Sequence, residues 1–179
     1  MDVNGLHRGI VNVENHNPTW KGEAEKTIDL LKRLLKDDII DVQHVGSTSI
    51  NEIVAKPIID IVVGVKDFQD IMRYNEILQE NGIIYRKQEH GNQLLYVCGD
   101  ISNEMISHHI HVVIWNDNEW NNYLNFRDYL NCHLEDALAY SKLKEELAKI
   151  YSDNRGSYTV GKQDMINNIL AKADKWRNE

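Results

Sequence analysis

Ile58-Ile59-Asp60-Ile61-Val62-Val63-Gly64-Val65 is the most informative stretch of this chain. Pro57 opens it, and its residues are apolar and largely β-branched on both faces except at Asp60, which is typical of a central strand. An ionised carboxylate is expensive to bury in such a strand and persists there only with a partner, such as a metal ion, a cation or several donors. Asp60 is therefore a candidate functional residue, and the alternative is a structural pair with an arginine or a turn amide.

A strand followed by a tight turn is expected immediately before this stretch. Apolar and polar residues alternate from Ile40 to Val45, and Gly46-Ser47-Thr48-Ser49 then ends the run with small residues. The amides and hydroxyls of these four residues have the chemistry to hold a phosphate, and Lys56 would add a cation. The spacing fits neither a P-loop nor a dinucleotide-binding fingerprint, so a plain turn and a solvated lysine are the alternatives.

Three histidines occur in His108-His109-Ile110-His111-Val112-Val113-Ile114-Trp115, which reads as another interior strand. Strand alternation sends His109 and His111 to one face and His108 to the other. A His-x-His pair on a strand suits a transition metal such as zinc, manganese, iron or nickel. The alternative is one hydrogen-bonded core histidine and one donor that faces a ligand. His44, near the end of the first strand, is a further candidate ligand of the same metal.

Helical periodicity separates and flanks these strands. After Asn17-Pro18-Thr19, apolar residues recur at three- and four-residue spacing up to Leu35, which predicts a first helix. Asp67 is a helix-cap residue and Asn81-Gly82 is a stop signal, so one inserted helix is expected between them. Two short strands are expected next, from Ile83 to Arg86 and from Gln93 to Cys98.

The remainder of the chain is expected to be helical. Apolar stripes predict three helices, through Trp120 to Leu130, Tyr140 to Ile150 and Met165 to Trp176. This order predicts an α+β fold, in which the Ile40, Ile58 and Val112 segments are neighbours in one mixed β-sheet with flanking helices and a helical C-terminal part. No repeat or linker interrupts the chain, so residues 1–179 are expected to form a single domain.

Two further groups of polar residues are candidates for anion binding. Arg127 shares a helical face with Trp120 and Tyr123, so its guanidinium is expected to point inward and to need an anionic partner. That partner is either a protein carboxylate, with Asp60 as one option, or a phosphate or carboxylate of a substrate. Tyr158 and Lys162 lie one turn apart near the start of the last helix and form either a surface pair or an anion-facing pair.

Composition narrows the classes of function. The 179 residues carry a formal net charge of -8, which argues against non-specific binding of nucleic acid or an anionic membrane and favours a small ligand. Two cysteines without CxxC spacing exclude a disulfide framework and a cysteine-rich zinc site. The N-terminus shows no signal-peptide pattern and no stretch approaches the ~20 apolar residues of a membrane span, so a cytoplasmic protein is expected.

Taken together, seven segments of this chain resemble the GrpB family, whose members look like a divergent branch of the nucleotidyltransferase superfamily. The resemblance covers nearly the whole chain, and the order of the segments makes it specific. They are His16-Asn17-Pro18-Thr19-Trp20, His44-Val45-Gly46-Ser47-Thr48-Ser49, Lys56-Pro57-Ile58-Ile59-Asp60-Ile61, His109-Ile110-His111-Val112, Phe126-Arg127-Asp128-Tyr129-Leu130, Tyr140-Ser141-Lys142-Leu143-Lys144 and Tyr158-Thr159-Val160-Gly161-Lys162.

The superfamily resemblance implies a nucleotide site and also shows where this chain departs from it. In nucleotidyltransferases the Gly-Ser turn holds the nucleoside triphosphate, and two carboxylates two residues apart plus a third on a later strand hold two magnesium ions. This chain keeps Gly46, Ser47 and Asp60. It has Val62 in place of the second carboxylate, and His109 and His111 where the third is expected. A single transition metal therefore suits these residues better than magnesium.

Two functions follow from the resemblance. In the first, the protein is a nucleotidyltransferase-like enzyme that moves a nucleotidyl group from a nucleoside triphosphate to an acceptor. Ser47 and Ser49 would then bind phosphate, Lys56 and Arg127 would neutralise it, and Asp60 with the two histidines would hold a metal or act in acid–base chemistry. In the second, the same cleft is a non-catalytic module, with an assisting role, that binds a nucleotide or a small anionic metabolite. Val62 favours the second function.

Overall fold

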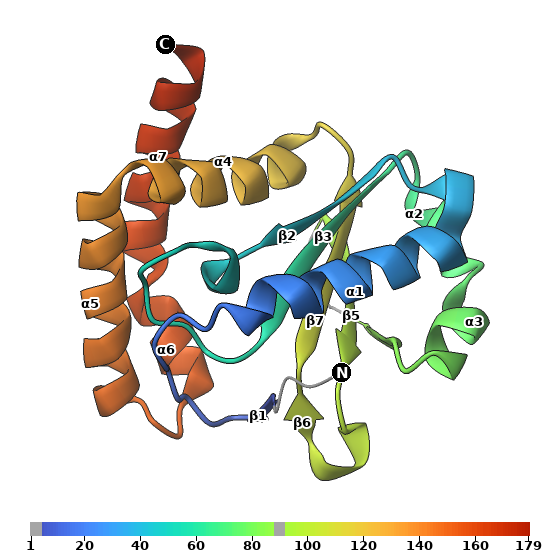
Figure 1. Cartoon of the computed structure of the whole chain (residues 1–179), viewed down its shortest axis with the longest axis horizontal. Coiled ribbons are helices and arrows are strands. Elements are labelled where there is room, and N and C mark those ends of the chain that lie inside the picture. The colour runs from blue at the N-terminus through green and yellow to red at the C-terminus, as the bar shows by residue number, and fades with distance from the viewer. Residues whose placement is uncertain (1–4, 88–91) are drawn as a thin grey trace.

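A five-stranded mixed sheet forms the centre of the computed structural model, which describes residues 5–87 and 92–179 (Figure 1). The strand order is β2-β3-β7-β5-β4, and only the β3 and β7 pair is parallel. The predicted adjacency of the three central segments is confirmed. The strands are β2 (Asp41–Val45), β3 (Ile59–Val65), β4 (Ile84–Arg86), β5 (Gln93–Cys98) and β7 (His108–Ile114).

The register of the two central strands positions the polar residues of the sheet. Asp60 on β3 pairs with His109 on β7, and Val62 pairs with His111. His108 is fully buried on the opposite face, and its Nδ1 lies 2.9 Å from the hydroxyl oxygen of Ser107. The predicted division of the histidines between the two faces is confirmed, because successive strand side chains alternate.

One face of the sheet is covered by α1 (Thr19–Leu35), α2 (Phe68–Met72) and α3 (Asn75–Glu80). In Figure 1, α1 runs across the front of the strands. The main core lies under these helices, where Trp20, Ala24 and Leu31 pack against alternate residues of β3 and β7. Asn17 caps α1 ahead of Pro18, since its Oδ1 accepts a hydrogen bond from the Thr19 amide at 3.0 Å, and burial of this amphipathic face stabilises the helix further.

The inserted segment forms two short helices rather than the single helix expected from sequence. Asp67 caps α2 as predicted, because its side chain accepts a hydrogen bond from the Gln69 amide. The helix is interrupted at Arg73 and Tyr74, whose side chains both bind Asp38 in the 3-10 turn Lys36–Asp38. These tertiary contacts at the break override the helical periodicity of the segment.

Four helices, rather than three, follow the sheet. They are α4 (Asn118–Cys132), α5 (Leu134–Ile150), α6 (Arg155–Gly161) and α7 (Gln163–Asn178). The short α6 was missed because it contains two glycines and little apolar periodicity, but Asn154 starts it by accepting a hydrogen bond from the Ser157 amide. Tyr158 therefore lies on α6, and Lys162 lies at the junction of α6 with α7.

The C-terminal helices gather on the other face and at one end of the sheet. In Figure 1, α4, α5 and α7 lie above and to the left of the strands. Trp120 of α4 packs on Val62 and Val113, while Tyr129, Tyr140 and neighbouring residues join α4, α5 and α7 in a second core. The face of the sheet that carries Asp60, His109 and His111 is therefore partly covered by helices, and these three side chains are partly exposed.

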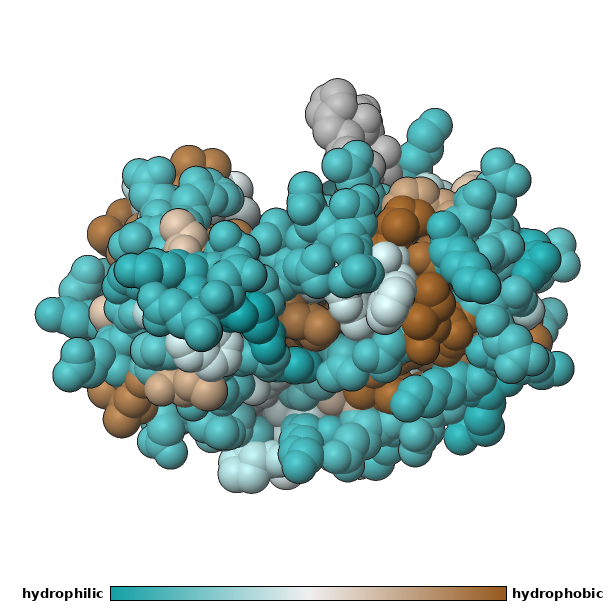
Figure 2. All heavy atoms as spheres, turned by 90° about the horizontal axis from the view of Figure 1, so that it is seen from above, coloured by the Kyte–Doolittle hydropathy of each residue, from teal (hydrophilic) through white to brown (hydrophobic). Residues whose placement is uncertain are grey.

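Smaller elements complete the described chain. The two-residue strands β1 (Leu6–His7) and β6 (Met105–Ile106) pair with each other, and β6 follows the 3-10 turn Ile101–Asn103. The face shown in Figure 2 is mainly hydrophilic, with apolar residues in narrow groups. Within residues 5–87 and 92–179, every helix is too short or too polar to cross a bilayer. Met1–Asn4, the start of the segment in which no signal-peptide pattern was found, lie outside the described residues.

Candidate functional site

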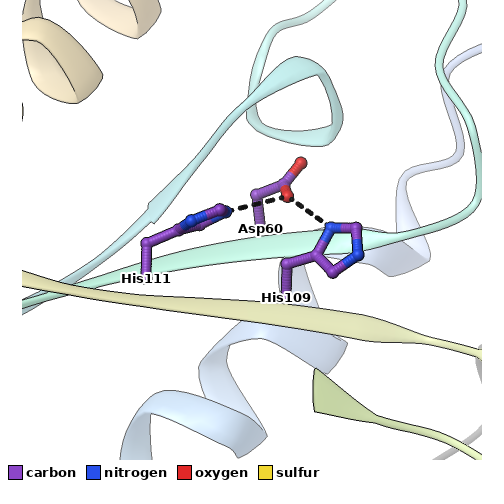
Figure 3. A group of neighbouring side chains, drawn as sticks. All are labelled: Asp60, His109 and His111. Carbon is purple, nitrogen blue, oxygen red and sulfur yellow. Dashed lines mark hydrogen bonds and ion pairs between the residues drawn. The ribbon is translucent and has the colours of Figure 1, made fainter. Parts of the chain in front are cut away.

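Three polar side chains converge on the face of the sheet opposite α1 (Figure 3). They are Asp60, His109 and His111, here called the triad. The Asp60 carboxylate extends from β3, and one of its oxygens, Oδ1, faces His109 and His111 of β7. Oδ1 lies 3.2 Å from His109 Nδ1 and 3.5 Å from His111 Nε2. One ligand atom from each of the three residues lies within 4.8 Å of the other two. The structure thus brings together three residues that sequence analysis named as candidate metal ligands.

The protonation states in the triad follow from burial and hydrogen bonding. Burial acts to raise the pKa of Asp60, but hydrogen bonds from His109 and His111 outweigh it and hold the pKa well below its ordinary value. Burial lowers the pKa of His109 despite its bond to Asp60. An Asp60 carboxylate beside a neutral His109 ring is therefore the state expected at neutral pH. His111 Nδ1 is buried and has no hydrogen-bond partner among the described residues.

The Gly-Ser turn lies directly against the triad. Gly46 has a φ of +68°, and a Cβ atom placed there would lie 2.5 Å from Asp60 Oδ2, so glycine is required on both counts. Ser47 lines the adjoining cavity with Gly46. The other two hydroxyls of the turn are used inside the fold, because Ser49 Oγ donates to the Gly46 carbonyl and Thr48 Oγ1 lies 2.9 Å from His44 Nε2.

A cavity of about 660 Å³ opens over the triad and extends between the sheet and the C-terminal helices. Its wall carries four cationic side chains against two carboxylates, in contrast to the net charge of -8 on the whole chain. The carboxylates are Asp60 and Glu119, the cations are Lys56, Lys144, Arg155 and Lys162, and the aromatic lining includes Tyr123, Phe126, Tyr140 and Tyr158. The cavity is suited to an anion that also offers an apolar or aromatic face.

The lysines of this wall are held in an environment that disfavours their charge. Burial, reinforced by neighbouring cations, lowers the pKa of Lys56 and Lys162 to about 8, although Asp60 acts in the opposite direction. Burial and the other two lysines lower the pKa of Lys144 to about 7. Both Lys56 and Lys162 lie within cation–π distance of the Tyr158 ring, at 5.5 Å and 4.5 Å. An anionic ligand would relieve the repulsion between these ammonium groups.

Lys144 and Arg155 were not named as site residues from sequence. Lys144 is 1 % exposed, donates a hydrogen bond to the Val54 carbonyl and lies over the Tyr140 ring. The sequence does indicate that Lys144 is unusual, because a charged residue there interrupts the apolar stripe of Tyr140 and Leu147. Asp60 interrupts its apolar strand in the same way. Arg155 opens a short helix without apolar periodicity and carried no such signal.

Arg127 and His44 do not join the triad. Arg127 donates to Asp128 Oδ1 at 2.7 Å, to Gln43 Oε1 at 3.1 Å and to the His44 carbonyl at 3.0 Å. The salt bridge with Asp60 suggested by sequence is therefore wrong, because α4 aims the guanidinium at the edge strand β2. The cavity lining does not include Arg127, and His44 binds Thr48 rather than the triad.

The triad fits one transition-metal ion better than a pair of magnesium ions. Two imidazole nitrogens and one carboxylate oxygen are ligands that zinc, manganese and iron accept, whereas magnesium prefers oxygen alone. The position of a second carboxylate is occupied by Val62, which is fully buried with Val45, Val113 and Trp120. The sheet therefore offers donors for a single metal ion at this position.

Comparison with known proteins shows which family this chain belongs to. The family model described as GrpB protein matches residues 10–172. The chain belongs to the GrpB family. The glutamate-rich protein GrpB of Alkalihalophilus pseudofirmus is 36 % identical over 169 residues, which cover 93 % of this chain and 97 % of that protein. The crystal structure of GrpB from Enterococcus faecalis superposes with a TM-score of 0.87 at 29 % identity, covering 94 % of this chain and 100 % of that one.

This GrpB-family protein also has the fold of a much larger enzyme. The Cid1 poly(U) polymerase, solved with Mg and 3'-dATP bound, has a TM-score of 0.55 at 13 % identity. The match covers 82 % of this chain and 49 % of the polymerase. The protein therefore has a nucleotidyltransferase-like α+β fold with a mixed sheet, flanking helices and a helical C-terminal part, as predicted. At this identity the likeness shows the fold alone.

Proposed function

We propose that this GrpB-family protein binds a nucleotide, or a closely related phosphorylated metabolite, together with one divalent transition-metal ion. The observation that carries the proposal is the placement of the triad at one end of a cavity whose wall supplies four cationic side chains. A metal site alone would not require four buried or partly buried cations, and an anion site alone would not require two histidines converging on one carboxylate oxygen.

Each part of the cavity has a distinct role in this proposal. Asp60, His109 and His111 hold the metal ion, which supplies positive charge for a phosphate oxygen. Lys56 and Lys162 neutralise the rest of a phosphate chain, with Lys144 behind them. The Gly46 and Ser47 turn adjoins the metal position and provides the close backbone approach that a phosphate group needs.

The aromatic lining provides for the non-phosphate part of the ligand. Tyr123 packs against His111 with ring centroids 5.0 Å apart, and Phe126 packs edge-on against Tyr140 with ring centroids 5.5 Å apart. These rings line the same cavity as the cations. A base, or another flat apolar group, would gain stacking and burial there.

Nucleotidyl transfer is the second candidate function, and the contact between Gly46 and Asp60 favours it. This contact sets a phosphate-holding turn directly against a metal-binding acid, the combination that the nucleotidyltransferase superfamily uses. The described part of the chain brings together one group of three metal-ligating side chains, so any transfer would proceed with a single ion held by the protein. Binding without turnover needs no further residues and is therefore the first candidate.

Calorimetric titration of the metal-stripped protein tests the proposal. Zinc and manganese are titrated first, and pyrophosphate, AMP and ATP are then titrated with and without each metal. We expect zinc or manganese to bind, magnesium to bind far more weakly, and the polyphosphates to bind more tightly when the metal is present. Thermal unfolding gives an independent readout, since a ligand selective for the folded state raises stability by RT ln(1 + [L]/Kd).

A matched variant controls for adventitious histidine binding. His7 is exposed on β1, far from the triad in sequence, and His7→Gln should leave the metal affinity unchanged. If neither the metals nor the polyphosphates bind the wild-type protein, the proposal is wrong. Release of pyrophosphate from ATP in the presence of the bound metal would move nucleotidyl transfer to first place.

A further inference from the structure

Arg155 lies near both the triad and the lysines of the cavity wall. It is the first residue of α6, and its Nη2 lies 3.3 Å from His109 Nε2. Its charge also acts on both Lys56 and Lys162, so it adjoins the cationic wall. Within residues 5–87 and 92–179, Arg155 forms no ion pair with a carboxylate. A guanidinium in a cavity, held by a neutral imidazole, is available to a stronger acceptor.

The contact with Arg155 fixes which nitrogen of His109 carries the proton. A guanidinium has five donors and no acceptor, so His109 Nε2 must be the acceptor in this bond. The neutral ring then carries its proton on Nδ1, where it donates to Asp60 Oδ1 at 3.2 Å. In the metal-free protein, Arg155, His109 and Asp60 thus form a continuous chain of donors and acceptors.

A metal ion in the triad is incompatible with this chain. His109 directs Nδ1 toward Asp60 and His111, so Nδ1 is the nitrogen that would bind the metal. The neutral ring would then carry its single proton on Nε2, which becomes a donor. Two donors would face each other across 3.3 Å, and the guanidinium would have to leave. No net proton is gained or lost by the ring, because its N–H only changes position.

We propose that Arg155 competes with the metal ion for His109 and, once displaced, joins Lys56 and Lys162 in binding the anionic ligand. This inference rests on the metal and anion sites of the proposed function and adds the order of events. Metal binding frees the Arg155 guanidinium from His109 to contact the anion, so the metal raises anion affinity beyond its own direct contact. By reciprocity, an anion that captures Arg155 also raises metal affinity.

Metal titration of Arg155→Met in the absence of any anion tests the competition. We expect zinc to bind the variant about tenfold more tightly than the wild type, the equivalent of one net hydrogen bond from a charged donor. Pyrophosphate in the presence of zinc should bind the variant more weakly. Lys162→Met is the matched control, because it removes a positive charge from the same cavity without removing a donor to His109. Its zinc affinity should rise less than that of Arg155→Met.

The outcomes separate this inference from the proposed function. If zinc binds the wild type and Arg155→Met equally well, or binds the variant less well, the competition is wrong while the metal site stands. If Lys162→Met gains as much zinc affinity as Arg155→Met, the effect is one of charge alone and the inference is again wrong. Failure of both proteins to bind zinc overturns the metal site and this inference together.

A spectroscopic measurement on the wild-type protein needs no variant of Arg155. Long-range proton–nitrogen spectra of the histidine-labelled protein report which ring nitrogen carries hydrogen, and His109→Gln identifies the signals. We expect His109 to carry its proton on Nδ1 without metal and on Nε2 with zinc. A proton on Nε2 in the metal-free protein would contradict the donor assignment on which the inference rests.

Discussion

Two polar clusters adjoin the Gly46–Ser49 turn, and their charges are paired to different extents. Arg127 donates to a carboxylate, an amide and a carbonyl of the protein, so its charge is matched within the fold. The Asp60 carboxylate faces His109 and His111, beside a cavity whose four cations form no ion pair within residues 5–87 and 92–179. Both residues gave the same sequence signal, a charge on an apolar face. The surroundings of the charge, rather than its burial, separate structural pairing from ligand binding.

Asp60→Asn is expected to have the largest effect and to act mainly on binding. The substitution removes an anionic metal ligand, so zinc affinity should fall by at least about a hundredfold, more than is usual for changes to residues that only support the ligands. The amide oxygen can still accept from His109, but the fold stabilises the ionised carboxylate, so the free energy of unfolding should also fall, by about 1–2 kcal/mol. Calorimetry with zinc and urea unfolding measure the two quantities.

The contrary result for Asp60 would be just as clear. If Asp60→Asn destabilised the protein strongly while zinc bound normally, the triad would be a structural cluster like that of Arg127. The comparison between the clusters would then fail, and the metal site would have to lie elsewhere.

Arg127→Met should show the opposite pattern, with a loss of stability and intact ligand binding. The substitution removes the donor that Gln43 and the His44 carbonyl share, and it leaves Arg177 as the remaining partner of Asp128, which should cost about 2–3 kcal/mol. Arg177→Met is a matched control, because Arg177 binds the same carboxylate from a more exposed position and should cost less than about 1 kcal/mol. Urea unfolding of both variants, followed by zinc titration, gives the comparison. A loss of zinc affinity in Arg127→Met without a loss of stability would contradict it.

Much of the sheet and half of the site could be predicted from local pattern. The apolar run around Asp60 and the alternation at His109 and His111 are properties of single strands, and strand geometry converts them into a shared face. The position of Ser47 against Asp60 followed from the superfamily resemblance. The pairing of β3 with β7 also follows from their length and apolar character.

The remaining features depend on tertiary contacts that no local pattern records. For Arg127 the sequence left the partner open, with Asp60 as one option, and the structure gives Asp128, because helical phase indicates the inward direction of a side chain but not what lies there. The break at Tyr74 depends on Asp38, 36 residues away. Arg155 reaches His109 across 46 residues from a short helix that depends on a cap and on packing. Lys144 is the exception, since its place on an apolar stripe could have been recognised.

Lys162→Met should weaken anion binding without loss of stability, which tests the cationic side of the cavity. The removal of one of the converging cations should weaken pyrophosphate binding about tenfold, as expected for one charge-assisted hydrogen bond. The stability of the ligand-free protein should stay the same or rise by up to about 1 kcal/mol, because the charge is held there at a cost. Lys172→Met is the control, since it removes the same charge from α7 at an exposed ion pair with Asp136. An equal loss of pyrophosphate affinity in both variants would show that only the overall charge matters.

The smallest expected effect is the pH dependence of anion binding, and its sign follows from the depressed pKa values of the lysines. Lys56 and Lys162 have pKa values lowered to about 8, and Lys144 to about 7, by burial first and by neighbouring cations second. An anion that contacts Lys56 and Lys162 binds their charged forms, so pyrophosphate affinity should fall as the pH rises, by roughly threefold between pH 7 and pH 8. Calorimetry in buffers of different ionisation enthalpy should also detect proton uptake on binding.

The stability of the ligand-free protein should change in the opposite direction over the same range. The folded-state pKa values lie below the ordinary lysine value of 10.5, so the folded protein binds fewer protons than the unfolded chain from about pH 7 to pH 10. The free energy of unfolding therefore gains from these lysines as the pH rises, while the affinity for pyrophosphate is lost. Lys162→Met should flatten both slopes, and Lys172→Met should flatten neither. Affinity and stability that rise together with pH would show that the lysines are not the anion-binding groups, and the cavity would lose the feature that distinguishes it from the Arg127 cluster.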